Sequence, residues 1–188
     1  LSIRRQRQMC IRDSKIPEIK GTFRKLCKSI GQKNITEFSY RLDKTQEAKI
    51  LLGLEFSRGE EEKKSFIKSM KNKKYKITDL SDDEISKVHL RYMSGGRAPE
   101  FLDGNVEEVF KVDFPERPGA LMQFLELLKD KWNITLFHYK NQGSIYGGAL
   151  VGFSLKPSQL ENLNKDLLKT EYPFLRVSDN AGYKAFLK

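Results

Sequence analysis

The residues best suited to bind a small molecule lie in two turns of the same kind. Each turn places a glycine, Gly21 or Gly119, where a strand is expected to give way to a helix. A glycine lets the backbone approach a ligand closely, and the unpaired N–H groups that open a helix favour an anion such as an amino-acid carboxylate. Tyr40 and Tyr139 follow the two turns at matching places and would each add a hydroxyl and an aromatic wall. The pattern predicts a backbone cradle at Gly21 and Gly119.

Phe23 and Leu121 are large apolar side chains two residues after these glycines. They would border such a site, but they would serve equally well as core residues in the first turn of a helix. Turns with proline and glycine between a strand and a helix are also common. On residue types alone, both interpretations stay open.

Residue patterns for catalysis are absent from the sequence. It has no glycine-rich phosphate loop, no paired metal-binding histidines and no serine-nucleophile turn. Its two histidines, His89 and His138, have no second candidate ligand at a useful spacing. We therefore expect no catalytic residue, no metal and no cofactor in this chain.

The two turns belong to a sequence repeat, and the repeat predicts the elements that hold them. Four blocks match in order at offsets of 97 to 99 residues: 17–23 with 115–121, 34–40 with 133–139, 50–56 with 149–155, and 80–82 with 177–179. A duplication this regular indicates one module used twice.

Apolar periodicity within each copy predicts the order βαββαβ. In the second copy we expect strands over 106–114, 133–140, 146–155 and 174–177, with helices from Gly119 towards Trp132 and from about Pro157. In the first copy we expect helices over 21–30 and 59–70 and strands over 34–42, 47–56 and 75–79. Each copy ends in a polar turn, Ser81-Asp82 or Ser178-Asp179, whose serine or aspartate is expected to cap a helical tail.

This order defines an α+β fold class, with two ferredoxin-like subdomains in tandem, antiparallel sheets and helices packed on one face. Two such units most economically join edge to edge or pack sheet against sheet, because either arrangement hides edge strands. We place the first subdomain at 15–93, a Gly- and Pro-containing linker at 94–105 and the second subdomain at 106–188.

Residues 1–14 do not follow the repeat. The first copy needs a strand there, but Arg4 to Ser14 lacks the alternation of apolar and charged residues found over 106–114. The run also resembles translated sequencing-adaptor bases, so we interpret it as a non-native segment. A short arginine-rich targeting peptide is the alternative. In either case we expect the first copy to lack its native first strand.

Composition restricts the classes of protein further. No apolar run in the 188 residues approaches the ~20 residues needed to span a bilayer, so we expect a soluble protein with no membrane partner. Cys10 and Cys27 have no metal-ligand spacing, and so few cysteines favour a reducing compartment. The formal charge of +10 suggests nucleic acid as a binding partner. However, the lysines after Gly59 are mixed with Glu60-Glu61-Glu62 on an expected exposed helix, and no glycine-aromatic strand motif is present. We expect no nucleic-acid partner.

Three stretches together resemble a known family. They are Phe114 to Leu121, Trp132 to Tyr139, and Leu80 to Glu84 with His89 to Arg97. Over residues 15–188 the chain resembles the regulatory region of biosynthetic threonine dehydratase, also called threonine ammonia-lyase. The resemblance implies two ACT-like subdomains that follow a pyridoxal-phosphate catalytic domain. It also implies binding of isoleucine as feedback inhibitor and of valine as opposing activator.

The resemblance implies site residues and partners as well. The effector site would involve Phe23, Tyr40, Leu121 and Tyr139, with Arg91 as a further candidate. Lys140 stands where many relatives carry arginine. This departure weakens the case for a guanidinium contact at that position.

The catalytic domain and its pyridoxal phosphate are absent from this sequence, so the chain would be a sensor without its enzyme. Its partners would be isoleucine, valine, the enzyme's own catalytic domain and further copies of the chain, because the parent enzyme is a tetramer. The implied location is the cytoplasm, or a plastid or mitochondrion in a eukaryote.

Two alternatives remain at this point. An ACT-like module of another amino-acid enzyme would prefer an amino acid such as serine or phenylalanine. A basic RNA-binding module would bind with an affinity that falls steeply with salt concentration.

Overall fold

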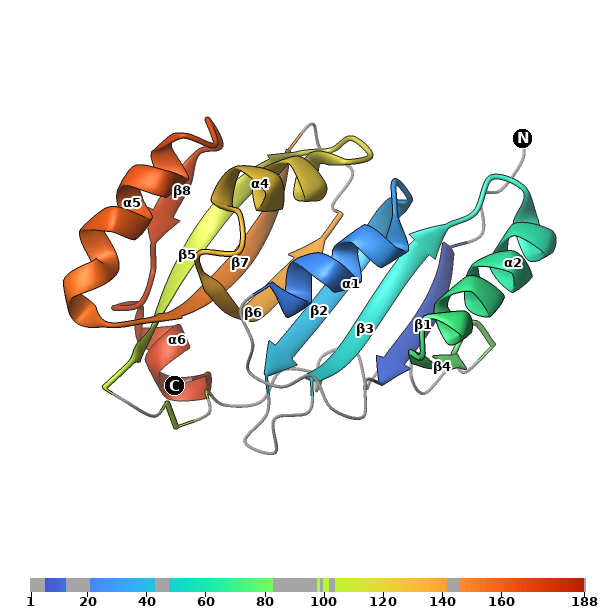
Figure 1. The fold of residues 1–188 in the computed structure, drawn as a ribbon, viewed down its shortest axis with the longest axis horizontal. Helices are drawn as coiled ribbons and strands as arrows, with labels where there is room; N and C mark the ends of the chain where they lie inside the picture. The colour runs from blue at the N-terminus through green and yellow to red at the C-terminus, as the bar shows by residue number, and fades with distance from the viewer. Residues whose placement is uncertain are drawn as a thin grey trace.

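A computed structural model describes residues 6–12, 21–42, 48–82, 98, 100–101, 104–141 and 146–187. These residues form an antiparallel eight-stranded sheet with helices packed against it (Figure 1). The strands are β1 Gln6–Arg12, β2 Asn34–Leu42, β3 Ala48–Glu55, β4 Lys76–Asp79, β5 Val106–Pro115, β6 Asn133–Lys140, β7 Tyr146–Leu155 and β8 Phe174–Arg176. The helices are α1 Thr22–Ile30, α2 Gly59–Asn72, α4 Ala120–Leu128, α5 Leu160–Leu168 and α6 Ala181–Phe186, with a 3-10 turn η2 at Pro157–Gln159.

The predicted βαββαβ order is confirmed in the second copy, and the two helices and three strands predicted for the first copy are confirmed, with small shifts at the element ends. The largest shift is in α4, which ends at Leu128 and does not reach Trp132. Lys129 follows with φ of 56° and ψ of −157°, a non-helical conformation that ends the helix. Trp132 therefore belongs to the loop before β6.

Strand β1 corrects the expectation that the first copy lacks its first strand. The backbone of residues 6–12 pairs antiparallel with β3, with Gln6 opposite Glu55 and Arg12 opposite Lys49, and its other edge pairs with β4. Backbone hydrogen bonds to two neighbours hold this strand, and backbone pairing does not depend on the type of side chain. The expectation that residues 1–14 are non-native stays a prediction, as do the subdomain boundaries.

The two copies join edge to edge. The strand order is β4-β1-β3-β2-β6-β7-β5-β8, so β2 of the first copy and β6 of the second form the seam. Of the two arrangements considered from the sequence, the structure has the continuous sheet and not the sheet-on-sheet packing.

The register at the seam shows an approximate twofold axis. Ser39 lies opposite His138, and the two residues are also equivalent in the repeat, at an offset of 99. On either side of this pair, Phe38 lies opposite Tyr139 and Tyr40 opposite Phe137. The axis therefore passes through the Ser39–His138 pair and exchanges the two copies.

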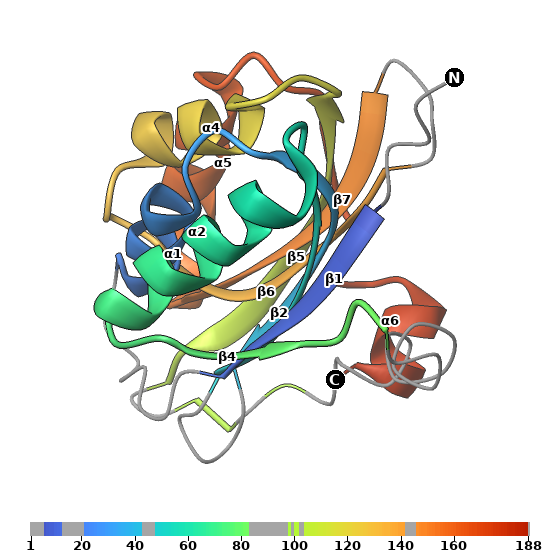
Figure 2. The same cartoon turned by 90° about the vertical axis from the view of Figure 1, so that its right-hand side faces the viewer.

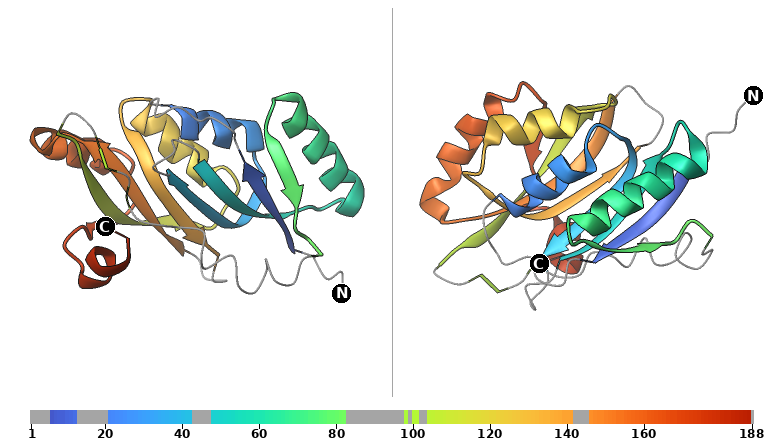
Figure 3. Two further views of the ribbon diagram at one scale, coloured as in Figure 1. Left: turned by 90° about the horizontal axis from the view of Figure 1, so that it is seen from below. Right: turned by 45° about the vertical axis from the view of Figure 1, so that its right-hand side comes forward.

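Helices α1, α2, α4 and α5 cover one face of the sheet, and α6 lies on the other (Figures 2 and 3). The main core fills the space between the four helices and the sheet, and it runs across the seam. The Phe137 ring of the second copy lies 5.2 Å from the Phe23 ring and 5.5 Å from the Phe38 ring of the first. The two copies thus share one hydrophobic core. No described helix is long and apolar enough to cross a membrane.

The tail helix α6 is capped one or two residues later than predicted. The Asn180 side chain accepts hydrogen bonds from the N–H groups of Gly182 and Tyr183. The prediction of Ser178 or Asp179 as the cap is wrong. The Ser178 hydroxyl instead donates to Glu108 and accepts from the backbone N–H of Val109, and these bonds tie the turn to β5. The corresponding tail of the first copy lies outside the described residues.

Candidate functional site

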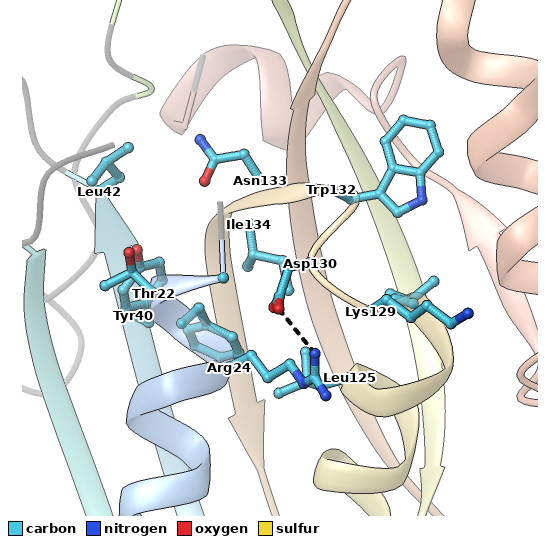
Figure 4. A pocket seen from close by; sticks show the side chains of 13 residues that line it. Thr22, Arg24, Tyr40, Leu42, Leu125, Lys129, Asp130, Trp132, Asn133 and Ile134 are labelled. Atoms are coloured by element: carbon cyan, nitrogen blue, oxygen red, sulfur yellow. Dashed lines mark hydrogen bonds and ion pairs between the residues drawn. The ribbon is translucent and has the colours of Figure 1, made fainter. Parts of the chain in front are cut away.

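Two hollows lie where the copies meet on the helix-covered face. The first, shown in Figure 4, encloses about 430 Å³ including open solvent at its mouth, and the second encloses about 480 Å³ on the same measure. The first is lined by residues 21–24, 40 and 42 of one copy and by 125, 128–130 and 132–134 of the other. The second is lined by 33–35 and 38 of the first copy and by 114–121, 137 and 139 of the second.

The approximate axis relates the two hollows to each other. Each takes its turn and its tyrosine from one copy and the start of a strand from the other copy. Asn34 and Ile35 line the second hollow, and their repeat counterparts Asn133 and Ile134 line the first. A molecule bound in either hollow would therefore contact both subdomains.

The structure distributes the sequence-predicted residues between these hollows. Gly21, Phe23 and Tyr40 line the first hollow. Gly119, Leu121 and Tyr139 line the second. Arg91 lies outside the described residues. The candidates thus form two related sites and not a single one.

Both turns require glycine, as the sequence indicated. Gly21 has φ of 90° and Gly119 has φ of 87°, in the left-handed region that a residue with a Cβ rarely adopts. The two glycines are the N-cap residues of α1 and α4, and neither helix has a side-chain cap. The N–H groups that open a helix need acceptors, so each turn is a suitable place for a carboxylate.

Phe23 is a core residue as well as a lining residue of the first hollow. Its ring is buried and lies 4.7 Å from the Tyr40 ring in an edge-to-face arrangement and 5.4 Å from the Phe38 ring. Tyr40 is also buried, with 2% of its surface exposed. In the second hollow, Leu121 takes the place of Phe23 and is half-buried. The two sites therefore differ in how much of their wall is aromatic.

An ion pair lies at the mouth of the first hollow (Figure 4). Arg24 Nη1 donates to Asp130 Oδ2 at 3.0 Å, so the pair joins the start of α1 to the loop after α4. A Cβ added to Gly21 would lie 2.8 Å from Asp130 Oδ1, which places this carboxylate directly over the first turn. The nearest group to a Cβ on Gly119 would be Gln32 Nε2, at 4.0 Å. An acid thus lies over one turn and an amide near the other.

Glu116 and Tyr139 form the polar part of the second hollow. Burial, and after it the adjacent Glu116 carboxylate, raise the pKa of Tyr139 to about 12. The Oε1 atom of Glu116 is buried and has no hydrogen-bond partner.

Gly147 makes room for these two side chains. A Cβ on Gly147 would lie 2.5 Å from Tyr139 Cε2 and 2.8 Å from Glu116 Oε1. The tyrosine ring and the carboxylate therefore occupy the space that a side chain on β7 would fill.

Sequence reasoning gave no role to several lining residues. Among them are Lys33, Glu116, Arg117 and Asp130, which supply part of the charge of the two sites. The available signal for Glu116 was the repeat, because Pro17-Glu18 matches Pro115-Glu116. No pattern along the chain indicated that Lys33 or Asp130 faces the turn of the opposite copy.

The continuous sheet and the paired hollows at its seam define the class of protein as a tandem ACT-like regulatory domain. The family model described as the C-terminal regulatory domain of threonine dehydratase matches residues 5–90 and 101–187. The chain belongs to this family, and the resemblance noted from the sequence is confirmed.

Relatives agree with this assignment. The chain is 41% identical over 172 residues to L-threonine dehydratase biosynthetic IlvA of Burkholderia multivorans, and 45% identical over 172 residues to the E. coli protein of that name. It is 35% identical over 172 residues to the chloroplastic biosynthetic threonine dehydratase of Arabidopsis thaliana. Each alignment covers 92% of this chain but only 33%, 33% and 28% of the relative.

The chain thus spans about a third of the length of the curated relatives that it matches. The matching part is the regulatory domain, so these 188 residues are not by themselves the enzyme.

Proposed function

We propose that the chain is the amino-acid sensor of a biosynthetic threonine dehydratase. Isoleucine would bind as feedback inhibitor and valine as opposing activator, and together they would control the deamination of threonine to 2-oxobutanoate in isoleucine biosynthesis. The observation that carries the proposal is the pair of hollows at the seam. Each combines a helix-opening turn, a tyrosine and apolar walls drawn from both copies.

The second hollow suits an amino acid with a branched aliphatic side chain. Its carboxylate would accept hydrogen bonds from the N–H groups that open α4 after Gly119. Its side chain would lie against the apolar residues of the wall, which include Ile35, Phe38 and Phe114. Burial of apolar surface contributes about 25 cal/mol per Å², so the aliphatic part would supply much of the affinity.

The position of the hollows supports a mechanism by linkage. Because each hollow takes residues from both copies, a bound amino acid that fits one arrangement of the copies better than another shifts the equilibrium towards it. An interface with the catalytic domain would transmit this preference, with a coupling of about 1 to 3 kcal/mol. Pyridoxal phosphate belongs to that catalytic domain in the proposal, and the parent enzyme would be a tetramer.

Thermal unfolding tests the proposal directly. A ligand that binds only the folded chain stabilises it, by about 2.7 kcal/mol at a hundred times its Kd. We expect millimolar isoleucine and valine to raise the unfolding temperature of the 188-residue chain, and threonine to leave it unchanged. The absence of any shift with the branched-chain amino acids would contradict the proposal. A shift with serine or phenylalanine alone would favour the regulatory module of another enzyme.

A further inference from the structure

Beside its apolar walls and the start of α4, the second hollow contains a carboxylate, Glu116, with one oxygen that has no hydrogen-bond partner. Among the described residues, Glu116 Oε1 and Arg41 Nε are the two buried side-chain polar atoms without a hydrogen-bond partner. A buried carboxylate oxygen without a donor is costly, and such groups in native proteins usually have a specific cause. Glu116 also lines the second hollow, so a bound group is able to approach its carboxylate.

The carboxylate is held in place by its surroundings. The Tyr139 hydroxyl lies beside it, and the carboxylate contributes to the raised pKa of that phenol. On the sheet side it lies over Gly147, where a side chain would collide with it. These contacts leave Glu116 oriented beside Tyr139 at the wall of the hollow.

The two cationic side chains that line the second hollow have hydrogen bonds to other groups. Lys33 also lines the hollow, but its Nζ donates to Glu62. Arg117, the next residue along the chain, donates from Nη2 to Gln123 Oε1. Among the residues that the structure describes, no cation forms a hydrogen bond with Glu116 Oε1, so a bound group can supply the positive charge.

We propose that Glu116 is the receptor for the α-ammonium group of the bound amino acid. This inference rests on the proposed function and names the group that selects the class of ligand. The turn then recognises both charges of a zwitterion, with Glu116 binding the ammonium and the first N–H groups of α4, which begins four residues later, binding the carboxylate. An acid without an amino group would leave Glu116 unpaired, so the site discriminates against it.

The inference concerns the second hollow. Glu18 stands at the matching place of the first copy, outside the described residues.

Calorimetric titration of the full 188-residue chain tests the assignment with two ligands. They are isoleucine and 3-methylpentanoate, which is isoleucine without its amino group. The variants are Glu116→Gln, which keeps the shape but removes the charge, and Glu126→Gln, which makes the same change on the exposed side of α4. We expect Glu116→Gln to weaken isoleucine binding by about ten- to a hundredfold, the usual effect of losing a hydrogen bond to a charged group. Glu126→Gln should leave the affinity unchanged.

The unaltered chain provides a second measurement that does not depend on any variant folding. It should bind isoleucine at least about tenfold more tightly than 3-methylpentanoate, and Glu116→Gln should reduce this ratio towards one. Equal affinities of the unaltered chain for both ligands, or full isoleucine affinity in Glu116→Gln, would overturn the role of Glu116 and leave the proposed function standing. No isoleucine binding by the unaltered chain would overturn both.

Discussion

Arg41 and Glu107 form a buried, two-pronged ion pair that ties the first copy to the second. Arg41 Nη1 lies 2.7 Å from Glu107 Oε1, and Arg41 Nη2 lies 3.1 Å from Glu107 Oε2, with side chains only 5% and 3% exposed. The same pair holds the tail helix. Tyr183 donates its hydroxyl to Glu107, and Arg41 Nη2 donates to the carbonyl of Leu187. One ion pair thus joins β2, β5 and the end of α6.

Substitution of Arg41 by leucine should therefore destabilise the chain strongly. Removing one member of a buried pair leaves the other charge buried without a partner, which typically costs about 3 to 5 kcal/mol. Urea unfolding of Arg41→Leu measures this loss. Arg24→Leu is the matched control, because the Arg24–Asp130 pair is 32% and 56% exposed and such pairs contribute about 1 kcal/mol or less. Equal losses in the two variants would contradict the importance of the buried pair.

Two adjacent glycines in β7 should respond differently to the same change. Gly147→Ala would bring a methyl group to 2.5 Å from the Tyr139 ring, so the ring has to move and isoleucine binding should weaken. Gly148→Ala meets its nearest atoms, on Lys111 and Asp113, at 3.5 and 3.6 Å, which is ordinary contact. Titration of both variants with isoleucine distinguishes them. If the two alanines had the same effect, the second hollow would not be the binding site.

The acid over the first turn should make the two hollows unequal in affinity. The Asp130 carboxylate lies over Gly21, where the carboxylate of a bound amino acid would approach, and like charges repel. We expect isoleucine to bind the second hollow first and the first hollow at higher concentration. Asp130→Asn should tighten the weaker step and leave the tighter one unchanged. A titration in which Asp130→Asn alters neither step would count against this ordering.

Part of the free energy of unfolding should depend on pH through the carboxylate of Asp166. Hydrogen bonds from Lys131 and then Lys169 lower the pKa of Asp166 to about 2, from an ordinary 3.8, and Trp132 Nε1 donates to the same carboxylate. A lowered pKa contributes stability that is complete above the ordinary value and is lost as the pH falls from about 4 to about 2. Asp166→Asn should therefore flatten the decline of unfolding free energy over this range.

Fluorescence provides a readout for the Asp166 experiment, because Trp132 is the one tryptophan of the chain and lines the first hollow. Glu161→Gln is a suitable control, since Glu161 pairs with Lys165 on the exposed side of α5. An Asp166→Asn variant with the same pH profile as the unaltered chain would contradict the assignment.

Much of the fold could be predicted from the sequence, because each element occurs in both copies of the repeat. Where one copy is ambiguous, the other has clear periodicity, and the βαββαβ order and both glycine turns were predicted correctly. Strand β1 was missed because its residues lack the alternating pattern from which the other strands were predicted, although its backbone pairs with two neighbours. The α6 cap was missed because Ser178, Asp179 and Asn180 are all good capping residues, and only the bond from Ser178 to Glu108 decides among them.

The composition of the candidate site was less accessible from the sequence. Periodicity predicts which face of a strand is buried, but it does not predict the partner of an edge strand, so the β2–β6 seam was one of two arrangements. The opposite-copy walls of the hollows follow from that seam. Asn34 and Lys33 reach the second turn, and Asp130 reaches the first, only because the two strands pair in this register.

The axis through Ser39 and His138 has a consequence for how such a sensor responds. The two copies resemble a symmetric dimer whose halves have been joined in one polypeptide. A dimer of identical chains has to keep identical sites, because one gene segment encodes both. Fusion removes this constraint, and Asp130 over one turn and Gln32 near the other show that the halves have diverged. Two unequal sites would spread the response over a wider range of amino-acid concentration than two equal ones.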